Sequence, residues 1–480
     1  MKVYNTLARQ LEEVVPLEPG VIRMYNCGPT VYNDQHLGNY RTYTFADVLR
    51  RYLEYAGFRV VQIINITDVG HLTQDDIDSG EDKILKTARE RGWTARQVAD
   101  HFMERFFDDR RTLHMLEATK FPRAIEHIPE MVAMIRTLLD KGLAYTVGGN
   151  VYYDVSKFAG YGRLSGNTLD KLKHGARVEA NPDKRNPGDF ALWKTDAAHL
   201  MQFDAPWGRG FPGWHIECSA MSIKYLGETF DIHTGGEDHF FPHHECEIAQ
   251  SEGATGKPFV RYWMHARHVM WDGKKMSKSL QNVFLIRDAL DRGYDAQEIR
   301  YGLISHYRQP VNFSWKIFDD AKIALGRLRE FKRRLEDAPA PLESSAGATL
   351  TGPAKDDASL DGAIAEAKKR FAESMDDDLN VSGGIAAVMD FARDVNRALD
   401  GGAGGAKRAL DALLGFDRVF AVLGAADAEA PAEVTELAAR RAGARKEKNW
   451  KESDRLRDEI KSKGWTVEDT KDGQKLKRSR

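Results

Sequence analysis

At 480 residues the chain is longer than a single hydrophobic core usually supports, so roughly two to four domains are expected. Its 30% charged and 42% hydrophobic residues are ordinary for a globular protein, and no apolar run approaches the roughly 20 residues that cross a bilayer, which excludes a membrane protein. There is no secretion signal, and the three cysteines (Cys27, Cys218 and Cys246) are too few for a disulfide framework, so we expect a cytoplasmic protein with free thiols.

The net charge of −2 gives no sign of a nucleic-acid partner, but its distribution does. Residues 436–480 hold 15 lysines and arginines against 9 aspartates and glutamates, so this end is basic while the remainder is acidic. A basic end favours a polyanionic partner. A solvated charged helix explains the same composition.

The first elements predict a nucleotide-binding fold. Residues 21–28 form an apolar stretch that ends in glycine, and apolar residues recur at helical spacing from Arg41 to Tyr55. Residues 60–68 are apolar enough for a central parallel strand. Strand, turn, helix and strand in this order predict a right-handed crossover and a Rossmann-like, doubly wound parallel sheet, whose first turn and helix N-terminus face a phosphate.

The following elements predict an insertion and then a helical half. Helices are expected at 82–92, 94–117 and 126–142, and residues 143–200 change to short strands and turns, which indicates an inserted module. The α/β pattern resumes near Phe203, with a strand at 230–233 and a helix from Pro242. After Val283 the sequence is helical nearly throughout, apart from a linker at 338–362, a glycine-rich break at 401–405 and a second linker at 425–432.

Three side chains suited to a metal lie in the window 213–250: Cys218, His243 and Glu247. Pro242 suits the first position of a helix, so His243 and Glu247 would lie four residues apart on one helical face and could close on one ion. Taken alone, the pair is also explained by a solvated helix face.

Two loops are suited to a triphosphate. His36-Leu37-Gly38-Asn39 offers an imidazole and an amide beside a glycine that permits close backbone approach, and Lys275-Met276-Ser277-Lys278-Ser279 offers two ammonium groups and two hydroxyls. Phosphoryl and nucleotidyl transfer need donors and cations placed where negative charge builds up, rather than a covalent nucleophile. The first pattern alone is weak, and the second is rarer.

Together these loops resemble the two signatures of class I aminoacyl-tRNA synthetases. The second matches in every letter, whereas the first has Leu37 and Asn39 where its fullest form has isoleucine and histidine. Further motifs resemble the cysteinyl-tRNA synthetases, from about residue 20 to 335 and more weakly beyond: Cys27-Gly-Pro-Thr-Val-Tyr, Asn65-Ile-Thr-Asp, Gly213-Trp-His-Ile-Glu-Cys, Gly235-Gly-Glu-Asp, Phe241-Pro-His-His-Glu and Met375-Asp-Asp-Asp.

The resemblance implies one zinc ion per subunit, bound by Cys27, Cys218, His243 and Glu247. Two thiolates, an imidazole and a carboxylate suit Zn²⁺. In the family this zinc holds the thiol of substrate cysteine as a thiolate. An apolar pocket separates near-isosteres such as serine and cysteine poorly, so a metal–thiolate bond supplies selectivity without an editing domain.

The resemblance also implies the other site residues, which are catalytic His36, Asn39, Lys275 and Lys278; substrate-binding Cys27, Thr67 and Trp214; and ATP-binding His36, Gly38, Gly236, Asp238 and Lys278. Core packing is an alternative for Trp214. His215 and Glu217 have no assigned role, and His244 and Glu245 either orient the ligands or lie on the helix surface.

Three stretches depart from the family pattern. The chain between Asp68 and Lys83 is longer than the commonest form, and its His71 is either a polar group near the site or part of a loop. Cys246 stands where asparagine is usual. The C-terminal end has Lys475-Leu476-Lys477 where many members have an aromatic residue, and core packing is the expected role of Trp465, the nearest aromatic.

The implied domains are a Rossmann-type catalytic domain in two halves (1–120 and 201–265), an inserted connective module (121–200), a stem-contact region with the lysine loop (266–325), a helical bundle (326–424) and a basic anticodon-binding region (433–480). The implied reaction is ATP-dependent activation of L-cysteine to cysteinyl-adenylate, with Mg²⁺, and transfer to the terminal adenosine of tRNA(Cys). No heptad seam indicates a dimer, so a monomer is expected.

Two alternatives share the fold. A ligase that joins activated cysteine to an amino sugar has the zinc site and the adenylate chemistry but lacks the anticodon-binding end. A non-catalytic tRNA-binding or zinc-sensing relative keeps the fold but loses a signature. The helical region after Val283 and the basic end favour the tRNA enzyme over the first, and the presence of both signature loops argues against the second.

Overall fold

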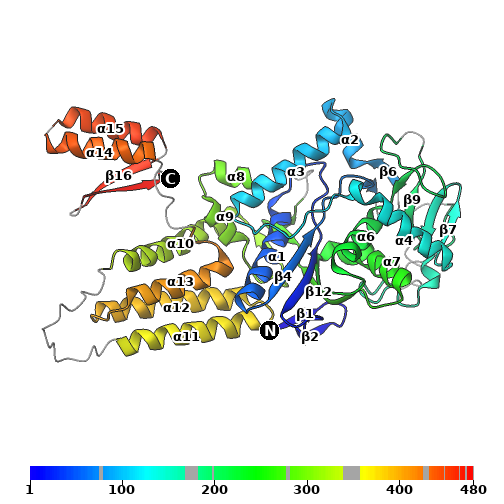
Figure 1. Cartoon of the computed structure of the whole chain (residues 1–480), viewed down its shortest axis with the longest axis horizontal. Helices are drawn as coiled ribbons and strands as arrows, with labels where there is room; N and C mark the ends of the chain where they lie inside the picture. Colours follow the sequence, from blue (N-terminus) through cyan, green and yellow to red (C-terminus); the bar gives the residue numbers. More distant parts are fainter. Residues whose placement is uncertain are drawn as a thin grey trace. The chain divides into compact units, whose positions relative to one another are not determined.

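A computed structural model describes residues 1–74, 79–167, 182–196, 199–276, 282–338, 357–424, 432–447, 449–463, 465–470 and 473–478. The chain divides into two compact units, residues 1–420 and residues 421–480, each described by itself below (Figure 1). Within the described ranges, no helix is long and apolar enough to cross a membrane.

A four-stranded parallel sheet with the order β12-β11-β3-β4 organises the first unit. Its strands are β3 (Val21–Asn26), β4 (Arg59–Ile64), β11 (Phe230–Gly236) and β12 (Val260–Ala266). Helix α1 (Leu37–Tyr55) connects β3 to its neighbour β4, which confirms the predicted strand–helix–strand unit. The helix begins at Leu37, earlier than the apolar spacing from Arg41 indicated.

Both faces of this sheet are covered. Tyr25 and Ile63 lie in one hydrophobic core with Ile216 and Ala220 of helix α6 (Trp214–Leu226). The alternate strand residues, such as Met24, point to the opposite face, where α1 contacts the sheet, and they are buried too. The doubly wound α/β fold is therefore confirmed.

The expectation that residues 60–68 form a central strand is wrong. Strand β4 ends the sheet order, and an irregular segment at 119–124 takes the place of a further strand. The N–H groups of Thr119 and Lys120 donate to the carbonyl of Gln62, and the N–H of Ile66 donates to that of Pro122. The apolar sequence of β4 fits because this segment covers its outer edge.

The inserted module forms an antiparallel sheet with the order β10-β9-β8-β7, which confirms the predicted change of structure. Its strands are β7 (Ala144–Val147), β8 (Asn150–Tyr153), β9 (Phe190–Lys194) and β10 (Phe211–Pro212). Gly213 joins β10 to α6, and a Cβ atom there would lie 2.1 Å from the carbonyl oxygen of Ala191. Only glycine lets α6 begin this close to β9.

The helices predicted after β4 are α2 (Lys83–Arg91), α3 (Ala95–Thr112) and α4 (Ile128–Asp140). Helix α3 ends before the predicted residue 117, because the chain turns so that the N–H of Leu116 donates to Asp47 Oδ1 at 2.7 Å. The short elements of the first unit are β1 (Lys2–Asn5), β2 (Gln10–Glu13), β5 (Leu72–Gln74), β6 (Ser79–Asp82), β13 (Val269–Trp271), β14 (Lys274–Lys275) and β15 (Val311–Phe313).

The helical half contains α8 (Ile286–Asp291), α9 (Ala296–Leu303), α10 (Trp315–Glu336), α11 (Asp357–Asp376), α12 (Val381–Asp400) and α13 (Ala406–Phe420). The expected domain boundary between residues 325 and 326 falls inside α10, and the expected linker 338–362 extends too far, because α11 already begins at Asp357. The break at 401–405 separates α12 from α13, as predicted.

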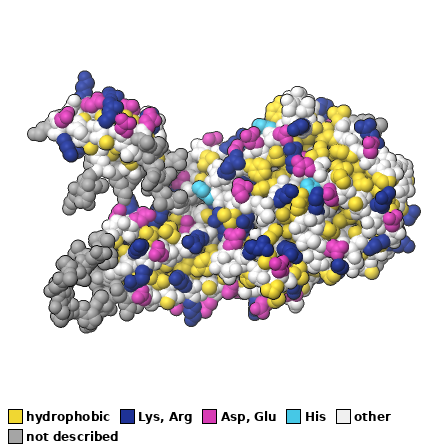
Figure 2. All heavy atoms as spheres, viewed as in Figure 1, with side chains coloured by type: hydrophobic (Ala, Val, Ile, Leu, Met, Phe, Trp, Pro, Cys, Tyr) yellow, Lys and Arg dark blue, Asp and Glu magenta, His cyan; other side chains and the backbone are white. Residues whose placement is uncertain are grey.

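The second unit packs α14 (Ala432–Lys446) and α15 (Trp450–Ser462) on the hairpin of β16 (Trp465–Thr470) and β17 (Gly473–Arg478). Trp465 is buried in its core with Leu437 and Ile460, which confirms the packing role expected for it. Figure 2 shows basic and acidic side chains interspersed over the visible face of this unit's described residues.

Candidate functional site

A cavity of about 850 Å³ lies at the carboxyl ends of β3, β4 and β11. This is the edge at which open α/β sheets bind their ligands. Nine of the predicted site residues line it: Cys27, His36, Asn39, Thr67, Trp214, Cys218, Gly236, Asp238 and His243.

The first signature forms the N-terminus of α1. His36 is the N-cap residue, and its Nδ1 accepts the backbone N–H of Asn39 at 3.2 Å. In return, Asn39 Oδ1 accepts the N–H of His36 at 3.0 Å. Asn39, which departs from the fullest family pattern, therefore completes a capping box and holds His36 at the cavity wall.

The described start of the second signature, residues 275–276, lies close to the first signature, residues 36–39. Lys275 ends β14, which pairs with β13, and Met276 lines the cavity. Gly38 does not line it, but a Cβ atom there would lie 3.6 Å from Met276 Sδ. The side chain of Lys275 and the whole of Lys278 lie outside the described residues.

The four predicted zinc ligands come together. The donor atoms of Cys27, Cys218, His243 and Glu247 lie within 4.8 Å of one another, and all four residues are buried. Cys27 follows β3, Cys218 is on α6, and His243 precedes α7 (Glu245–Thr255) in a π-type turn. His243 Nε2 lies 3.1 Å from Glu247 Oε1, as the four-residue spacing predicted.

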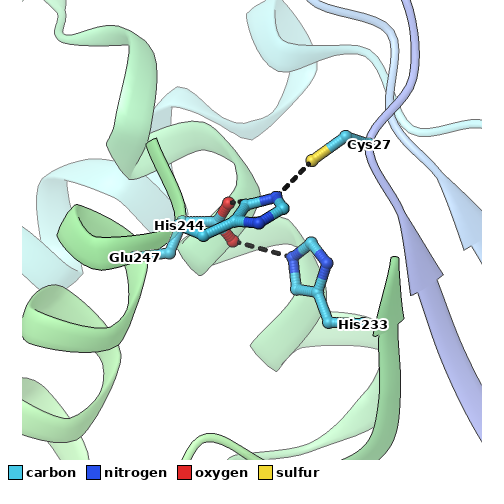
Figure 3. A group of neighbouring side chains, drawn as sticks. All are labelled: Cys27, His233, His244 and Glu247. Atoms are coloured by element: carbon cyan, nitrogen blue, oxygen red, sulfur yellow. Dashed lines mark hydrogen bonds and ion pairs between the residues drawn. The ribbon is translucent and has the colours of Figure 1, made fainter. Parts of the chain in front are cut away.

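A second group shares two members with the first and adds His233 and His244 (Figure 3). His233, on β11, lies with its Nε2 3.1 Å from Glu247 Oε2, and His244 Nε2 lies 3.2 Å from Cys27 Sγ. Neither histidine lines the cavity, whereas Cys27, Cys218 and His243 all do. The first group is thus the one that opens on the cavity.

Charge is concentrated in this cluster. Burial acts to raise the pKa of the Cys27 thiol, but the hydrogen bond with Cys218 and the charge of His244 outweigh burial and lower that pKa well below its usual value. Burial likewise opposes ionisation of Glu247, yet His233 and His243 bring the pKa of this carboxyl to about 2. A thiolate and a carboxylate among imidazoles form a donor set that suits a soft divalent cation.

Thr67 has a fixed hydrogen-bonding pattern. Asn65 Oδ1 accepts the N–H of Gly28 at 2.8 Å, so its Nδ2 faces Thr67 Oγ1, to which it donates at 3.1 Å. The Thr67 hydroxyl donates in turn to Glu217 Oε2 at 2.8 Å. Glu217, which had no assigned role, is fully buried and orients the threonine that lines the cavity.

Trp214 is half-buried at the cavity, and its ring centroid lies 4.3 Å from that of His243. His215 Nδ1 lies 2.9 Å from His243 Nδ1 and so contacts the same ring. Trp214 therefore lies in the wall of the cavity rather than in the hydrophobic core.

His244 and Glu245 do not lie on the helix surface, because both are fully buried. Besides contacting Cys27, His244 pairs with His265 through Nδ1 at 2.7 Å. Glu245 accepts three backbone N–H groups of residues 162–165, at 2.8 to 3.2 Å, and so fixes the inserted module against α7. Cys246 is buried outside both metal groups, with its Sγ 3.8 Å from the hydroxyl of Tyr161.

Several other cavity residues were missed by the sequence reasoning or left open, among them Thr30, His71, Lys83 and His239. Only His71 carried a signal, because it lies in the stretch between Asp68 and Lys83 that departs from the family pattern. Thr30 and His239 lie within or beside recognised motifs, but their spacing does not show where their side chains point.

Comparison with known families covers nearly the whole chain. Residues 13–323 match the family described as tRNA synthetases class I (C) catalytic domain, residues 370–426 match the DALR domain, and residues 427–476 match the cysteinyl-tRNA ligase anticodon binding domain. A cysteine–tRNA ligase of Symbiobacterium thermophilum is 44% identical over 488 residues, covering 100% of both chains. That of Caldicellulosiruptor saccharolyticus is 42% identical over 483 residues, also covering 100% of both.

Solved structures show the same fold at low identity. Mycobacterium tuberculosis methionyl-tRNA synthetase in complex with methionyl-adenylate superposes with a TM-score of 0.56 at 15% identity, over 84% of this chain and 90% of that one. A ternary complex of Agrobacterium radiobacter LeuRS with tRNA and LeuAMS gives 0.56 at 12% identity, over 86% of this chain and 84% of that one.

Proposed function

The chain belongs to the cysteine–tRNA ligases, which are class I aminoacyl-tRNA synthetases, and we propose that it selects its amino acid with a zinc ion held by Cys27, Cys218, His243 and Glu247. Its reaction joins cysteine to tRNA at the expense of ATP. The amino-sugar ligase is not favoured, because the match to cysteine–tRNA ligases continues through the anticodon-binding region to the end of both chains.

One observation supports the zinc proposal above the others. The ligand atoms of two cysteines, one histidine and one glutamate all lie within 4.8 Å of one another, and three of these residues also line the cavity. A catalytic zinc site needs protein ligands on one side and an open position for substrate on the other. Bound there, zinc would hold the sulfur of substrate cysteine as a thiolate, which serine cannot match. His215 and His233 support the proposal, because His215 contacts the ring of His243 and His233 contacts the carboxylate of Glu247, and such contacts orient metal ligands.

For the amino-acid end of the substrate, we assign Thr67 and Trp214 to the walls of the pocket beside the zinc ligands. For ATP, we assign His36, Gly38 and Asn39 on one side and Gly236 and Asp238 on the other. The carboxylate of cysteine attacks the α-phosphorus of ATP and releases pyrophosphate. A ribose hydroxyl of the tRNA's terminal adenosine then attacks the carbonyl carbon of the adenylate and releases AMP. Lys275 and Lys278, with Mg²⁺, are assigned to the charge that builds up on the phosphates.

The tRNA(Cys) would be read partly by the basic second unit, since residues 427–476 match an anticodon-binding family. We further propose a monomer in the cytoplasm. Three buried free cysteines, two of them in the metal cluster, support a reducing compartment.

Charging of total cellular tRNA with labelled cysteine, with and without prior zinc chelation, tests the proposal. We expect charging confined to one tRNA, lost on chelation and restored by added zinc. Charging that survives complete removal of zinc would overturn the metal's role, and cysteine-dependent pyrophosphate exchange without any charging would overturn the tRNA partner.

His36→Asn should separate catalysis from helix capping. Asparagine is a strong N-cap residue, so this variant should keep its stability, whereas His36→Ala should lose about 1 kcal/mol. Both variants should lower the rate of cysteine-dependent pyrophosphate exchange roughly a hundredfold, because each removes the imidazole that is assigned to the phosphates and the shorter asparagine amide does not replace it.

A matched control is Thr94→Ala. Thr94 caps α3 in the same way, accepting the N–H of Gln97 at 3.2 Å, but lies outside the cavity lining. It should lose similar stability and keep its exchange rate. Full activity of His36→Asn would contradict the catalytic assignment.

A further inference from the structure

Within the stretch that departs from the family pattern, the described residues 72–74 and 79–82 pair as the two strands of a hairpin against the site. Strands β5 and β6 pair Leu72 with Asp82, and the N–H of Lys83 donates to the carbonyl of His71 at 2.9 Å. His71 and Lys83 are therefore opposite one another at the base of the hairpin, and both line the cavity.

The base of the hairpin has little freedom to shift. Gly70 has a φ of +76°, and a Cβ atom there would lie 2.4 Å from the carbonyl oxygen of Pro212, two residues before Trp214. Asp82 accepts the N–H of Gly70 at 3.1 Å and that of Ile84 at 2.8 Å, which closes the loop from the other side. The hairpin base and the start of α6 thus lie in direct contact.

His71 is held by polar groups at both ring nitrogens. Lys83 Nζ lies 2.5 Å from Nε2, and Thr30 Oγ1 lies 2.5 Å from Nδ1. An ammonium has donors only, so Nε2 accepts and Nδ1 carries the hydrogen that it donates to Thr30. Thr30 lies opposite Thr67 in a parallel β-bridge, in which the N–H of Val31 donates to the carbonyl of Thr67 and the N–H of Thr67 donates to that of Pro29, both at 3.0 Å. This bridge connects His71 to the threonine assigned to the pocket.

The ring of His71 also stacks on Trp214. The two centroids are 4.3 Å apart with 10° between the planes, and His71 is 7% exposed. Trp214 contacts His243 next to it, also at 4.3 Å. A row of rings therefore runs from the hairpin through the pocket wall to a proposed zinc ligand.

We propose that His71 is a positioning residue of the amino-acid pocket: it fixes the indole of Trp214 by stacking and the hydroxyl of Thr30 by a hydrogen bond, with Lys83 holding its ring and tautomer. This inference rests on the proposed function, since it takes the Trp214 pocket to be the cysteine site. It gives the added hairpin a role in substrate binding that the family motifs do not carry.

Cysteine-dependent pyrophosphate exchange tests this role. His71→Ala should raise the KM for cysteine about tenfold, a loss of about 1.4 kcal/mol of binding, while the KM for ATP, kcat and zinc content stay near those of the unaltered protein. His71→Phe keeps the stacked ring and should recover part of the loss. Lys83→Met should also raise the KM for cysteine. The double variant should have nearly the same KM as His71→Ala alone, because Lys83 acts by holding the ring of His71.

The matched control is His199→Ala. His199 is a buried histidine that also stacks on an aromatic ring, that of Phe211 at 3.9 Å, and lies 3.5 Å from Asp82 of the same hairpin, but it does not line the cavity. It should leave the KM for cysteine unchanged. An unchanged KM in His71→Ala, equal changes in the two alanine variants, or additive effects of His71 and Lys83 would overturn the proposal. Failure of the unaltered protein to exchange with cysteine would instead overturn the proposed function.

Discussion

Replacing Cys218 with serine should lower kcat/KM for cysteine in pyrophosphate exchange roughly a thousandfold, equivalent to about 4 kcal/mol, because the protein would lose the zinc that holds the thiol of substrate cysteine. Cys218 is 1% exposed, and its sulfur lies within 4.8 Å of the other three proposed ligand atoms. A serine hydroxyl is a poor zinc ligand, so bound zinc should fall well below the expected level of about one ion per chain. Metal analysis and exchange kinetics on the same sample measure both effects.

Cys246→Ser is the matched control for Cys218→Ser. Cys246 is equally buried and lies between His243 and Glu247 in sequence, but it belongs to neither metal group. It should retain zinc and activity. If Cys218→Ser kept both, or if Cys246→Ser lost both, the proposed ligand set would be wrong. Loss of activity in Cys218→Ser with full zinc retained would also contradict it.

Arg300→Leu should destabilise the first unit by about 3 kcal/mol, because it removes one of the two arginine partners of the buried Asp47 carboxylate and leaves two backbone carbonyls without their donor. Arg300 is fully buried on α9, and its Nη2 donates to Asp47 Oδ2 of α1 at 2.5 Å. Its other nitrogens donate to the carbonyls of Phe420 at 2.6 Å and Leu113 at 2.9 Å. One side chain thereby joins α1, which carries His36, to the helical half.

Urea denaturation followed by tryptophan fluorescence measures this loss as a lower midpoint. Arg111→Leu is the control, since Arg111 pairs with Asp108 at the surface and such exposed pairs contribute less than about 1 kcal/mol. Equal midpoints for the two variants would contradict the importance of the buried pair.

The effect of Arg300 should also depend on pH. Burial acts to raise the pKa of Asp47, but Arg300 and Arg51 outweigh burial and lower it below the ordinary value. A lowered pKa stabilises the fold fully above the pKa of the unfolded chain, about 3.9, and that stability is lost as the pH falls through the folded value. The difference between the two proteins should therefore narrow below about pH 4. A constant difference across this range would contradict the Asp47 pairing.

Most of the candidate site could be predicted from the sequence, and the parts that could not share a cause. The spacing of His243 and Glu247 predicted their contact, because four residues make one helical turn. The spacing of Cys27 and Cys218 predicted nothing, and only the family resemblance placed them together. His71 was noticed because the stretch around it is unusual, but the sequence does not show that its ring meets Trp214.

The sequence by itself determined what depends on near neighbours along the chain: the alternation of strands and helices, the contact of His243 with Glu247, and the break between α12 and α13. These follow from local hydrogen bonds and from residue periodicity. It also showed that a soft metal and a nucleotide were the ligands to expect, since residue type fixes donor chemistry.

Only the tertiary structure decided which distant residues meet. It placed β4 at the end of the sheet order, put Cys27 against Cys218, stacked His71 on Trp214 and buried Arg300 beside Asp47. Such contacts arise when whole elements pack to bury apolar surface, and the energy of that packing is shared by many side chains. No short stretch of sequence specifies this packing, so these contacts can be identified only from the folded structure.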